Sequence, residues 1–335
     1  MITIYDIARA CNCAPATVCK ALNNYYGVSP ATKERILAMA ESMGYVPDTM
    51  ARYLITKRSH LVGVLFYVND YADLNHLLFM SVLSRFKKSL EKKGCDILLL
   101  SKDIKSNGGS FLKHCKTRRV DGVLVFGDFT SEPVKELLAS DIPTVGYDYM
   151  GDDIIGVTSD NSEKMDELTS YLIGLGHKNI VFIKGEDNFV TREREKGFLN
   201  AAKKAGLYDN CNIVHGHYYS RASAYEQTCK LLSGAAPPPT AIMYPDDYSA
   251  FGGIKAIKEK GLSVPGDISI TAYDGIEVFR DIYGLTTVEQ NVSEKGRLLA
   301  GKLMEAIESP KEYQKKIYKS ESKIIFGESC AKVKR

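Results

Sequence analysis

The chain has 335 residues, 44% of them hydrophobic and 25% charged, which is the composition of an ordinary globular protein with one to three domains. It contains no apolar run near the ~20 residues that a membrane-spanning helix needs. The first residues, MITIYD, lack the basic and apolar regions of a signal peptide. These features argue against a membrane or secreted protein, and we expect a cytoplasmic one.

The excess positive charge lies at one end of the chain. Residues 1–60 contain seven basic and four acidic side chains, so the whole net charge of +3 belongs to this segment. A small basic head on a neutral body is typical of a DNA-binding module attached to a sensor.

Eight cysteines are scattered along the chain. Three of them lie close together, at positions 11, 13 and 19, but they lack the paired spacing of a zinc site and have no histidine nearby. We therefore expect free thiols, no metal site and no cofactor.

Two short helices joined by a tight turn are predicted at the N-terminus. Thr3 can cap a helix that ends near Cys11, and Asn12 then occupies a turn position that requires a left-handed residue. Pro15 can begin a second helix, which stops at Asn23. This arrangement is a helix-turn-helix.

A third helix is predicted from Ser29-Pro30 to Gly44. Its apolar stripe needs a partner, which the inner faces of the first two helices supply. Residues 1–46 therefore form one all-helical domain. The residues of the stripe are Ile36, Leu37, Ala40 and Met43.

The second helix carries the chemistry of this domain. Val18 and Leu22 lie one turn apart and face inward, so the opposite face presents Ala16 and Lys20 outward, together with Pro15 and Thr17. Lys20 can donate to guanine or to a phosphate, and Ala16 can contact a thymine methyl group. The alternative for Lys20 is a lysine that is merely solvated.

Four segments closely resemble the head of the LacI/GalR family of bacterial repressors: TIYDIARA (3–10), ATVCKALN (16–23), VSPATKERI (28–36) and GYVPD (44–48). A helix-turn-helix alone is weak evidence, whereas this ordered series is specific, and the resemblance continues along essentially the whole chain. Asn12, Ala14 and Cys19 depart from the family's common Gly, Ser and Ser. Lys20 stands where Arg is usual and lacks its bidentate fork, so no operator sequence is transferred.

The resemblance implies a set of DNA contacts in the head. Pro15 and Ala16 match the two positions that choose the operator, Thr17 matches a common contact residue, and Lys20 matches a guanine-reading position. The positions that touch phosphates are matched by Thr3, Tyr5, Asn23, Ser29 and Thr32.

Residues 47–59 are predicted to form a hinge. Asp48 can cap a short helix, which could simply pack on its own protein. The resemblance implies instead that two such helices, one per subunit, pair in the minor groove, where Leu54 wedges between base pairs. Arg52 and Lys57 would add phosphate or minor-groove contacts. A helix this short is unstable alone, so we expect it to fold only on DNA or at a dimer interface.

Residues 60–335 alternate between apolar strands and helices, which predicts parallel α/β sheets covered on both faces. The expected helices are 76–93, 162–175, 192–205, 222–232 and 248–260. The expected strands are 61–66, 96–100, 122–126, 144–147, 179–183, 240–244 and 268–273.

Residues 60–335 divide into two such halves, which meet near residue 160. Together the halves resemble the two-lobed, Rossmann-like fold of periplasmic binding proteins. The resemblance implies lobes of about 60–159 with 288–319 and 160–287 with 320–335, because the family's chain crosses back between them. Taken with the head, the expected fold class is α/β: an N-terminal all-α helix-turn-helix followed by a two-lobed effector domain.

Ligands of parallel sheets bind at the carboxyl ends of the strands. That rule selects Tyr67, Asp148, Asp246 and Asp274, where carboxylates and rings suit a polyhydroxyl ligand. The resemblance adds residues at matching pocket positions, of which Arg194 is the one that grips the effector. The others are Phe79, Asp160 and Tyr219, and Asp246 and Asp274 match pocket positions as well.

Two of the acidic residues have a simpler interpretation. Asp247 could cap the helix that follows it, and Asp160 could cap the helix that starts at Ser162. The segment from Asn75 to Phe79 departs from the family's common Asn-Pro-Phe-Phe, and a longer loop precedes it. No sugar identity is therefore transferred from a relative.

The sequence also bears on three other functions. No nucleophile elbow, Walker loop or zinc-protease motif is present, which argues against an enzyme. A solute-binding protein for transport would need a signal peptide and no basic head. A relative that senses a protein instead of a small molecule stays open.

The resulting hypothesis is a transcription regulator, expected to be a repressor. A homodimer would place two heads on a near-palindromic double-stranded DNA operator. A small polar effector, expected to be a sugar or sugar derivative, would close the lobes and so change whether the hinge helices can pair.

Overall fold

The computed structural model describes residues 2–22, 24–46, 58–68, 74–103 and 109–333. The chain divides into two compact units, Met1–Ser59 and His60–Arg335. Among the described residues, no helix has the length and hydropathy to span a membrane.

The first unit holds the three predicted helices: α1 (Ile4–Ala10), α2 (Pro15–Leu22) and α3 (Pro30–Ser42). Asn12 adopts φ 48° in the turn between α1 and α2, as expected for a left-handed position. Ile7, Val18 and Ile36, one from each helix, are fully buried together. The prediction for Leu37 is wrong, because its side chain is 41% exposed on the side of α3 away from this core.

The first lobe of the second unit is built on a parallel sheet in the order β11-β5-β4-β3-β1-β2. One face packs against α5 (Leu77–Glu91) and α13 (Val292–Glu308), and the other against α6 (Phe111–Arg118) and α7 (Glu132–Leu138). The strands are β1 (Leu61–Tyr67), β2 (Asp96–Leu100), β3 (Gly122–Gly127), β4 (Thr144–Tyr147), β5 (Ile155–Ser159) and β11 (Ile317–Ser320).

The second lobe has a sheet in the order β12-β10-β9-β8-β6-β7, in which only β12 runs antiparallel. The helices α8 (Asn161–Gly174) and α9 (Phe189–Lys204) cover one face. The other face carries α10 (Arg221–Ser233), α11 (Asp247–Glu259) and α12 (Glu277–Tyr283). The strands are β6 (Ile180–Lys184), β7 (Cys211–His215), β8 (Ala241–Met243), β9 (Ser269–Asp274), β10 (Thr286–Glu289) and β12 (Lys323–Ile325), and a 3-10 helix spans Tyr208–Asn210.

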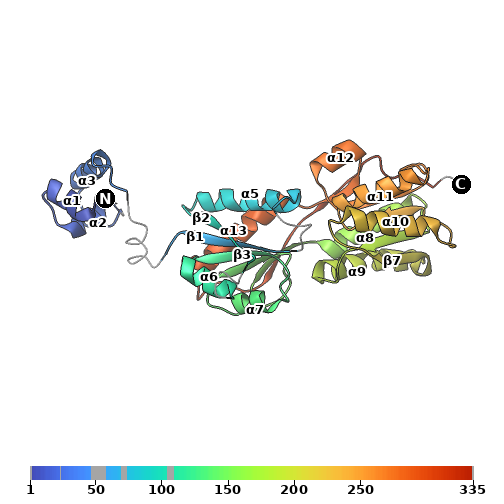
Figure 1. The fold of residues 1–335 in the computed structure, drawn as a ribbon, viewed down its shortest axis with the longest axis horizontal. Coiled ribbons are helices and arrows are strands. Elements are labelled where there is room, and N and C mark those ends of the chain that lie inside the picture. The colour runs from blue at the N-terminus through green and yellow to red at the C-terminus, as the bar shows by residue number, and fades with distance from the viewer. Residues whose placement is uncertain (1, 23, 47–57, 69–73, 104–108, 334–335) are drawn as a thin grey trace. The chain divides into compact units, whose positions relative to one another are not determined.

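The chain passes between the lobes three times: from β5 to α8, from β10 to α13 and from β11 to β12 (Figure 1). The seven expected strands and five expected helices are all present, and the expected fold class is confirmed. The prediction missed β5, β7, β10, β11 and β12, each of which is five residues or shorter. It also missed α6, α7, α12 and α13.

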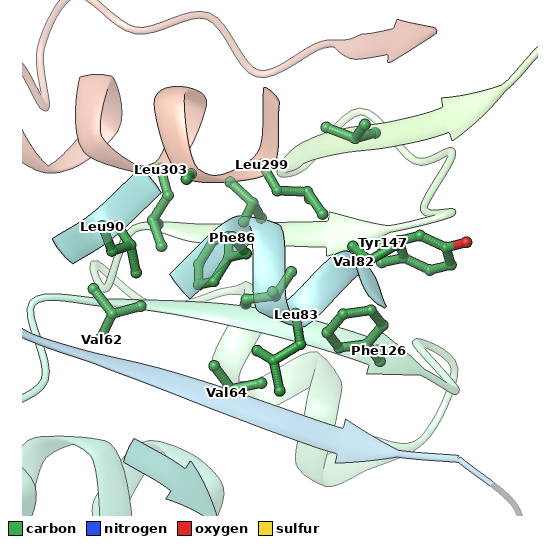
Figure 2. Close-up of a cluster of buried hydrophobic side chains, with 14 of the residues drawn as sticks. Val62, Val64, Val82, Leu83, Phe86, Leu90, Phe126, Tyr147, Leu299 and Leu303 are labelled. Atoms are coloured by element: carbon green, nitrogen blue, oxygen red, sulfur yellow. The ribbon is translucent and has the colours of Figure 1, made fainter. Parts of the chain in front are cut away.

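The core of the first lobe depends on the close approach of α5 to α13. Phe86 and Leu90 of α5 pack with Leu299 and Leu303 of α13 above the sheet (Figure 2). Gly296 makes this approach possible, because a Cβ atom there would lie 2.7 Å from the Val82 carbonyl oxygen and 2.9 Å from the Phe86 nitrogen.

We expect Gly296→Ala to destabilise the body by about 1–3 kcal/mol, because backbone atoms must move apart to admit the methyl group. Gly301→Ala on the same helix is the matched control, since nothing lies within 4 Å of its Cβ position. The control should be neutral or slightly stabilising, as Ala is a better helix former. Chemical unfolding followed by circular dichroism measures both; equal effects of the two variants would contradict the close-contact argument.

An aromatic cluster joins the two lobes. The ring of His76, which precedes α5, lies 4.7 Å from Phe79 of its own lobe, and 4.1 Å and 4.8 Å from Tyr219 and Tyr248 of the other (centroid distances). His76 is 2% exposed, and neither ring nitrogen has a hydrogen-bond partner among the residues that the structure describes. Burial lowers the pKa of His76 to about 4.

This environment predicts a pH-dependent loss of stability. The unfolded chain binds a proton on His76 near its ordinary pKa of 6.5, whereas the folded chain resists protonation down to about 4. The free energy of unfolding therefore decreases as the pH falls from the ordinary pKa of 6.5 to about 4. Between neutral pH and pH ~5, wild type should lose about 2 kcal/mol more than His76→Phe. Unfolding titrations at both pH values test this, with the exposed His215→Gln as control; parallel losses in wild type and His76→Phe would refute it.

Candidate functional site

The outer face of α2 is the first candidate site. Val18 and Ala21 are buried in the head, whereas Ala16 and Lys20 are exposed and Pro15 and Thr17 are half-buried. The helix therefore turns the residues expected to read DNA away from the core. A short helix with an outward basic residue matches the way in which recognition helices enter a major groove.

The residues expected to contact DNA phosphates lie at the starts of helices and on the surface of the head. The Thr3 backbone N–H and hydroxyl both donate to Asp6 Oδ2, at 2.9 and 2.7 Å, and these bonds lower the pKa of Asp6. Ser29 caps α3 by accepting from the Thr32 backbone N–H, and Tyr5 is 62% exposed. The predicted contacts Asn23, Arg52, Leu54 and Lys57 lie outside the described residues.

The second candidate site lies where the lobes meet. We call it the interlobe cluster; its members are Tyr147, Asp148, Arg194, Tyr218, Tyr219, Asp246, Tyr273, Asp274, Gln290 and Lys295. Nine of these ten side chains bear an ionisable acid or base or a tyrosine hydroxyl, and the tenth, Gln290, bears an amide. The members come from both lobes and from the segment that follows β10.

Gln290 connects the two halves of this cluster. Its Nε2 donates to Asp274 Oδ1 of the second lobe at 2.6 Å, and its Oε1 accepts from Lys295 Nζ of α13 at 2.5 Å. The same oxygen accepts from the Ser159 hydroxyl at 3.2 Å and the Tyr147 hydroxyl at 3.4 Å. One side chain on a crossover segment thus binds both lobes.

Arg194 is held in the second lobe by neutral groups. Its Nε donates to Asn161 Oδ1 at 3.0 Å and its Nη1 to the Pro245 carbonyl at 2.7 Å. The guanidinium carbon lies 3.5 Å from the centre of the Tyr273 ring. Asn188 caps α9 through the Thr191 N–H, so the helix begins at Phe189, three residues before the predicted start. Arg194 therefore lies in the second turn, facing inward.

Two acidic residues have roles that differ from those expected. Asp246, and not Asp247, caps α11: it accepts from the Ser249 N–H and also from the Tyr219 N–H. Asp247 accepts from Thr287 and from the Ile276 N–H. Burial raises the pKa of Asp246 to about 6 and that of Asp247 to about 7.

Asp160 occupies the cap position of α8 but makes no capping hydrogen bond. Its carboxylate instead accepts from the Ser322 N–H across the third crossover, at 3.0 Å. Tyr67 lies apart from the cluster, edge-on to Phe111 on the face of the first sheet that α6 and α7 cover. Phe79 lies on the opposite face, 5.6 Å from Tyr219 and 5.7 Å from Tyr147 between ring centroids.

Backbone strain coincides with the interlobe cluster. Asp148, Tyr219 and Asp274 have φ values of 55°, 60° and 111°, in the region that side-chain-bearing residues rarely adopt. Such conformations cost about 1–3 kcal/mol each and tend to gather at functional sites. All three were expected from the sequence to contact an effector.

Several buried polar atoms of this region lack a hydrogen-bond partner in the described part of the chain. They are both ring nitrogens of His76, the Tyr273 hydroxyl and Asp274 Oδ2. Burial raises the pKa of Asp274 well above its ordinary value, and the neighbouring Asp246 and Asp247 raise it further. An unsatisfied buried polar group costs ~1–3 kcal/mol, so a ligand that bonded these atoms would recover that free energy.

Sequence reasoning missed five members of this region: His76, Asn161, Tyr218, Gln290 and Lys295. Only Lys295 carries a clear signal. It lies one helical turn before Leu299, in the apolar stripe of α13, and a lysine in such a buried stripe is rare. The others needed the tertiary contacts.

Comparison with known proteins agrees with this geometry. Residues 3–48 match the family model described as bacterial regulatory proteins, lacI family, and residues 169–330 match a periplasmic binding protein-like domain. The chain is 30% identical to a probable HTH-type transcriptional repressor, ExuR, of Bacillus subtilis, over 95% of each chain.

Two solved structures are also similar. The lac repressor dimer bound to operator and an anti-inducer aligns with a TM-score of 0.82 at 21% identity, over 98% of this chain and 99% of that one. A LacI family regulator from Enterococcus faecium with bound ribose aligns with a TM-score of 0.71 at 24% identity, over 82% of this chain and 100% of that one. At these identities the structures show the fold. Together with the sequence relative and the head, they show that the chain belongs to the lacI family of bacterial regulatory proteins and is a DNA-binding transcription regulator.

Proposed function

We propose that this protein is a repressor that binds a near-palindromic operator as a homodimer and releases or engages it in response to a small polar effector. The observation that carries the effector role is the interlobe cluster, in which strained residues and unpartnered polar atoms from both lobes gather at one place. A sugar or sugar derivative suits this site, because hydroxyl groups pair with its polar atoms and C–H faces stack on its rings.

The proposed domains follow from the same evidence. Residues 1–46 form the DNA-binding head and 47–59 the hinge. Residues 60–335 form the effector domain, with lobes of about 60–159 with 288–319 and 160–287 with 320–335. Arg194 and Asp274 are the proposed direct contacts of the effector, whereas Asp160, Phe79 and Tyr67 each have a separate packing or backbone role.

In the proposed mechanism, the crossover segments transmit effector binding from the interlobe cluster to the hinge. Gln290 binds groups of both lobes and lies on a crossover, so an effector that engages Asp274 changes the contacts that set the lobe arrangement. Rotation of the first lobe, which follows the hinge in the chain, would then decide whether two hinge helices can pair in the minor groove. The proposal requires only that the effector bind one lobe arrangement better than the other.

The role of the outer face of α2 in DNA binding can be tested directly. An operator is first selected from a random double-stranded DNA pool with the full-length protein. Lys20→Ala should weaken binding to this operator by about 10–100-fold, as expected for the loss of one base contact, while binding to unrelated DNA falls much less. Fluorescence anisotropy at fixed salt measures both. Lys203→Ala, an exposed lysine of α9, is the control and should bind as wild type does; an equal loss on both DNAs would reduce Lys20 to a phosphate contact.

The hinge gives a second test. Leu54→Ala should weaken binding to the selected operator much more than binding to unrelated DNA, because an apolar wedge acts only where the base step is opened. The same anisotropy titrations measure the ratio of the two affinities. If that ratio is unchanged from wild type, Leu54 has no wedge role and the hinge is a simple linker.

A further inference from the structure

We propose that the loop between α2 and α3 is a further DNA contact, in which Tyr26 binds the sugar-phosphate backbone. Its ring packs on a deoxyribose, and its hydroxyl donates to a phosphate oxygen. The partner of this surface is double-stranded DNA. The inference rests on DNA binding by the head, and it is independent of the proposed operator symmetry and effector.

The first observation is the exposure of Tyr26. This residue is 100% exposed, the highest value among the large hydrophobic side chains of the described residues, and the neighbouring Tyr25 is 46% exposed. A single exposed ring is common on a protein surface and by itself indicates no partner. Its meaning depends on how its backbone is held and on which groups lie beside it.

The residues before Tyr26 are held by both neighbouring helices. The Tyr25 N–H donates to the Lys20 carbonyl of α2 at 2.9 Å. Lys33 of α3 donates from Nζ to Asn24 Oδ1, and Asn24 has a left-handed backbone with φ 60°. The ring of Tyr26 is therefore presented from an anchored backbone, which lowers the conformational entropy that is lost on binding.

The loop lies between two groups that are themselves expected to contact DNA. On one side is Lys20 of the outer face of α2, because a Cβ atom on Gly27 would lie 3.8 Å from Lys20 Nζ. On the other side is Ser29, which caps α3 by accepting from the Thr32 N–H. Tyr26 directly precedes Gly27, so its ring projects from a segment that has expected DNA contacts before and after it.

The charge of this region complements a phosphate backbone. Residues 20–33 contain two lysines, Lys20 and Lys33, and no acidic side chain. Both lysines lie against the loop, the first beside Gly27 and the second on Asn24. Tyrosine hydroxyls are among the groups that bond phosphate oxygens in protein–DNA complexes. The lysines attract the polyanion, and the exposed Tyr26 adds a neutral donor and an apolar ring to the same surface.

A neutral backbone contact differs measurably from a lysine contact. It carries no information about the bases, so its loss weakens binding to the operator and to unrelated DNA alike. It releases no counterion, so the salt dependence of the affinity stays that of wild type, whereas the loss of a lysine–phosphate contact reduces the slope by about one.

The first experiment measures DNA affinity of the full-length protein by fluorescence anisotropy, with the selected operator and with unrelated DNA, over a series of salt concentrations. Tyr26→Phe removes the hydroxyl and should weaken binding to both DNAs by about 3–10-fold, as for one hydrogen bond. Tyr26→Ala also removes the ring and should weaken both by about tenfold or more. Tyr208→Ala, a 54% exposed tyrosine of the body, is the matched control and should bind as wild type does.

The second experiment needs no substitution. Tetranitromethane nitrates exposed tyrosines, and mass spectrometry locates the modified residues. Tyr26 should react readily in the free protein and lose most of its reactivity when unrelated DNA is bound. Tyr208 should react equally in both samples, which controls for consumption of the reagent by DNA.

Wild-type affinity of Tyr26→Ala for both DNAs, or undiminished nitration of Tyr26 on DNA, overturns the inference. A loss of affinity confined to the operator also overturns it, because the side chain would then read bases. If only Tyr26→Ala binds weakly and Tyr26→Phe binds as wild type does, the phosphate bond is refuted. If the selection yields no operator, the proposed function fails, and the measurements on unrelated DNA still decide the role of Tyr26.

Discussion

The hydrogen bonds of Gln290 are the contact on which the body of this protein depends. The amide group donates to Asp274 on one lobe and accepts from Lys295 on the helix that covers the other. An amide is suited to this position because it offers donors and acceptors on one planar group without a net charge. Since Gln290 lies on a crossover, the segment that joins the lobes is itself hydrogen-bonded to both of them.

The interlobe cluster is costly for stability. It buries two cations and several carboxyls, leaves polar atoms without partners and holds three residues with positive φ. The flanking cores offset this cost. Phe86 and Leu299 pack in the first lobe and Phe182 and Phe198 in the second, all fully buried. The apolar cores thus lie within each lobe, and polar groups occupy the contact between the lobes.

The predicted elements were reliable where the pattern was local. The three head helices, with their Pro and Ser starts and the left-handed Asn12, follow from neighbouring residues alone. The long apolar strands of the body are equally local. The missed strand β12 was not local, because it pairs with β10 only once the chain has returned from the first lobe. The assignment of the α11 cap to Asp247 was wrong because Asp246 and Asp247 look alike in sequence and differ only in which donors surround them.

The sequence by itself determined the helix-turn-helix with its outward Lys20, the alternation of strands and helices in the body, and the acidic residues at the strand ends. These follow from periodicity and chain geometry, which neighbouring residues set. Only the tertiary structure decided that Gln290 joins the lobes, that His76 is enclosed between tyrosines of the other lobe, and that Lys295 is buried beside Asp148. Each of these contacts links residues far apart along the chain. Their environment, and with it their chemistry, exists only once the crossovers have brought both lobes together.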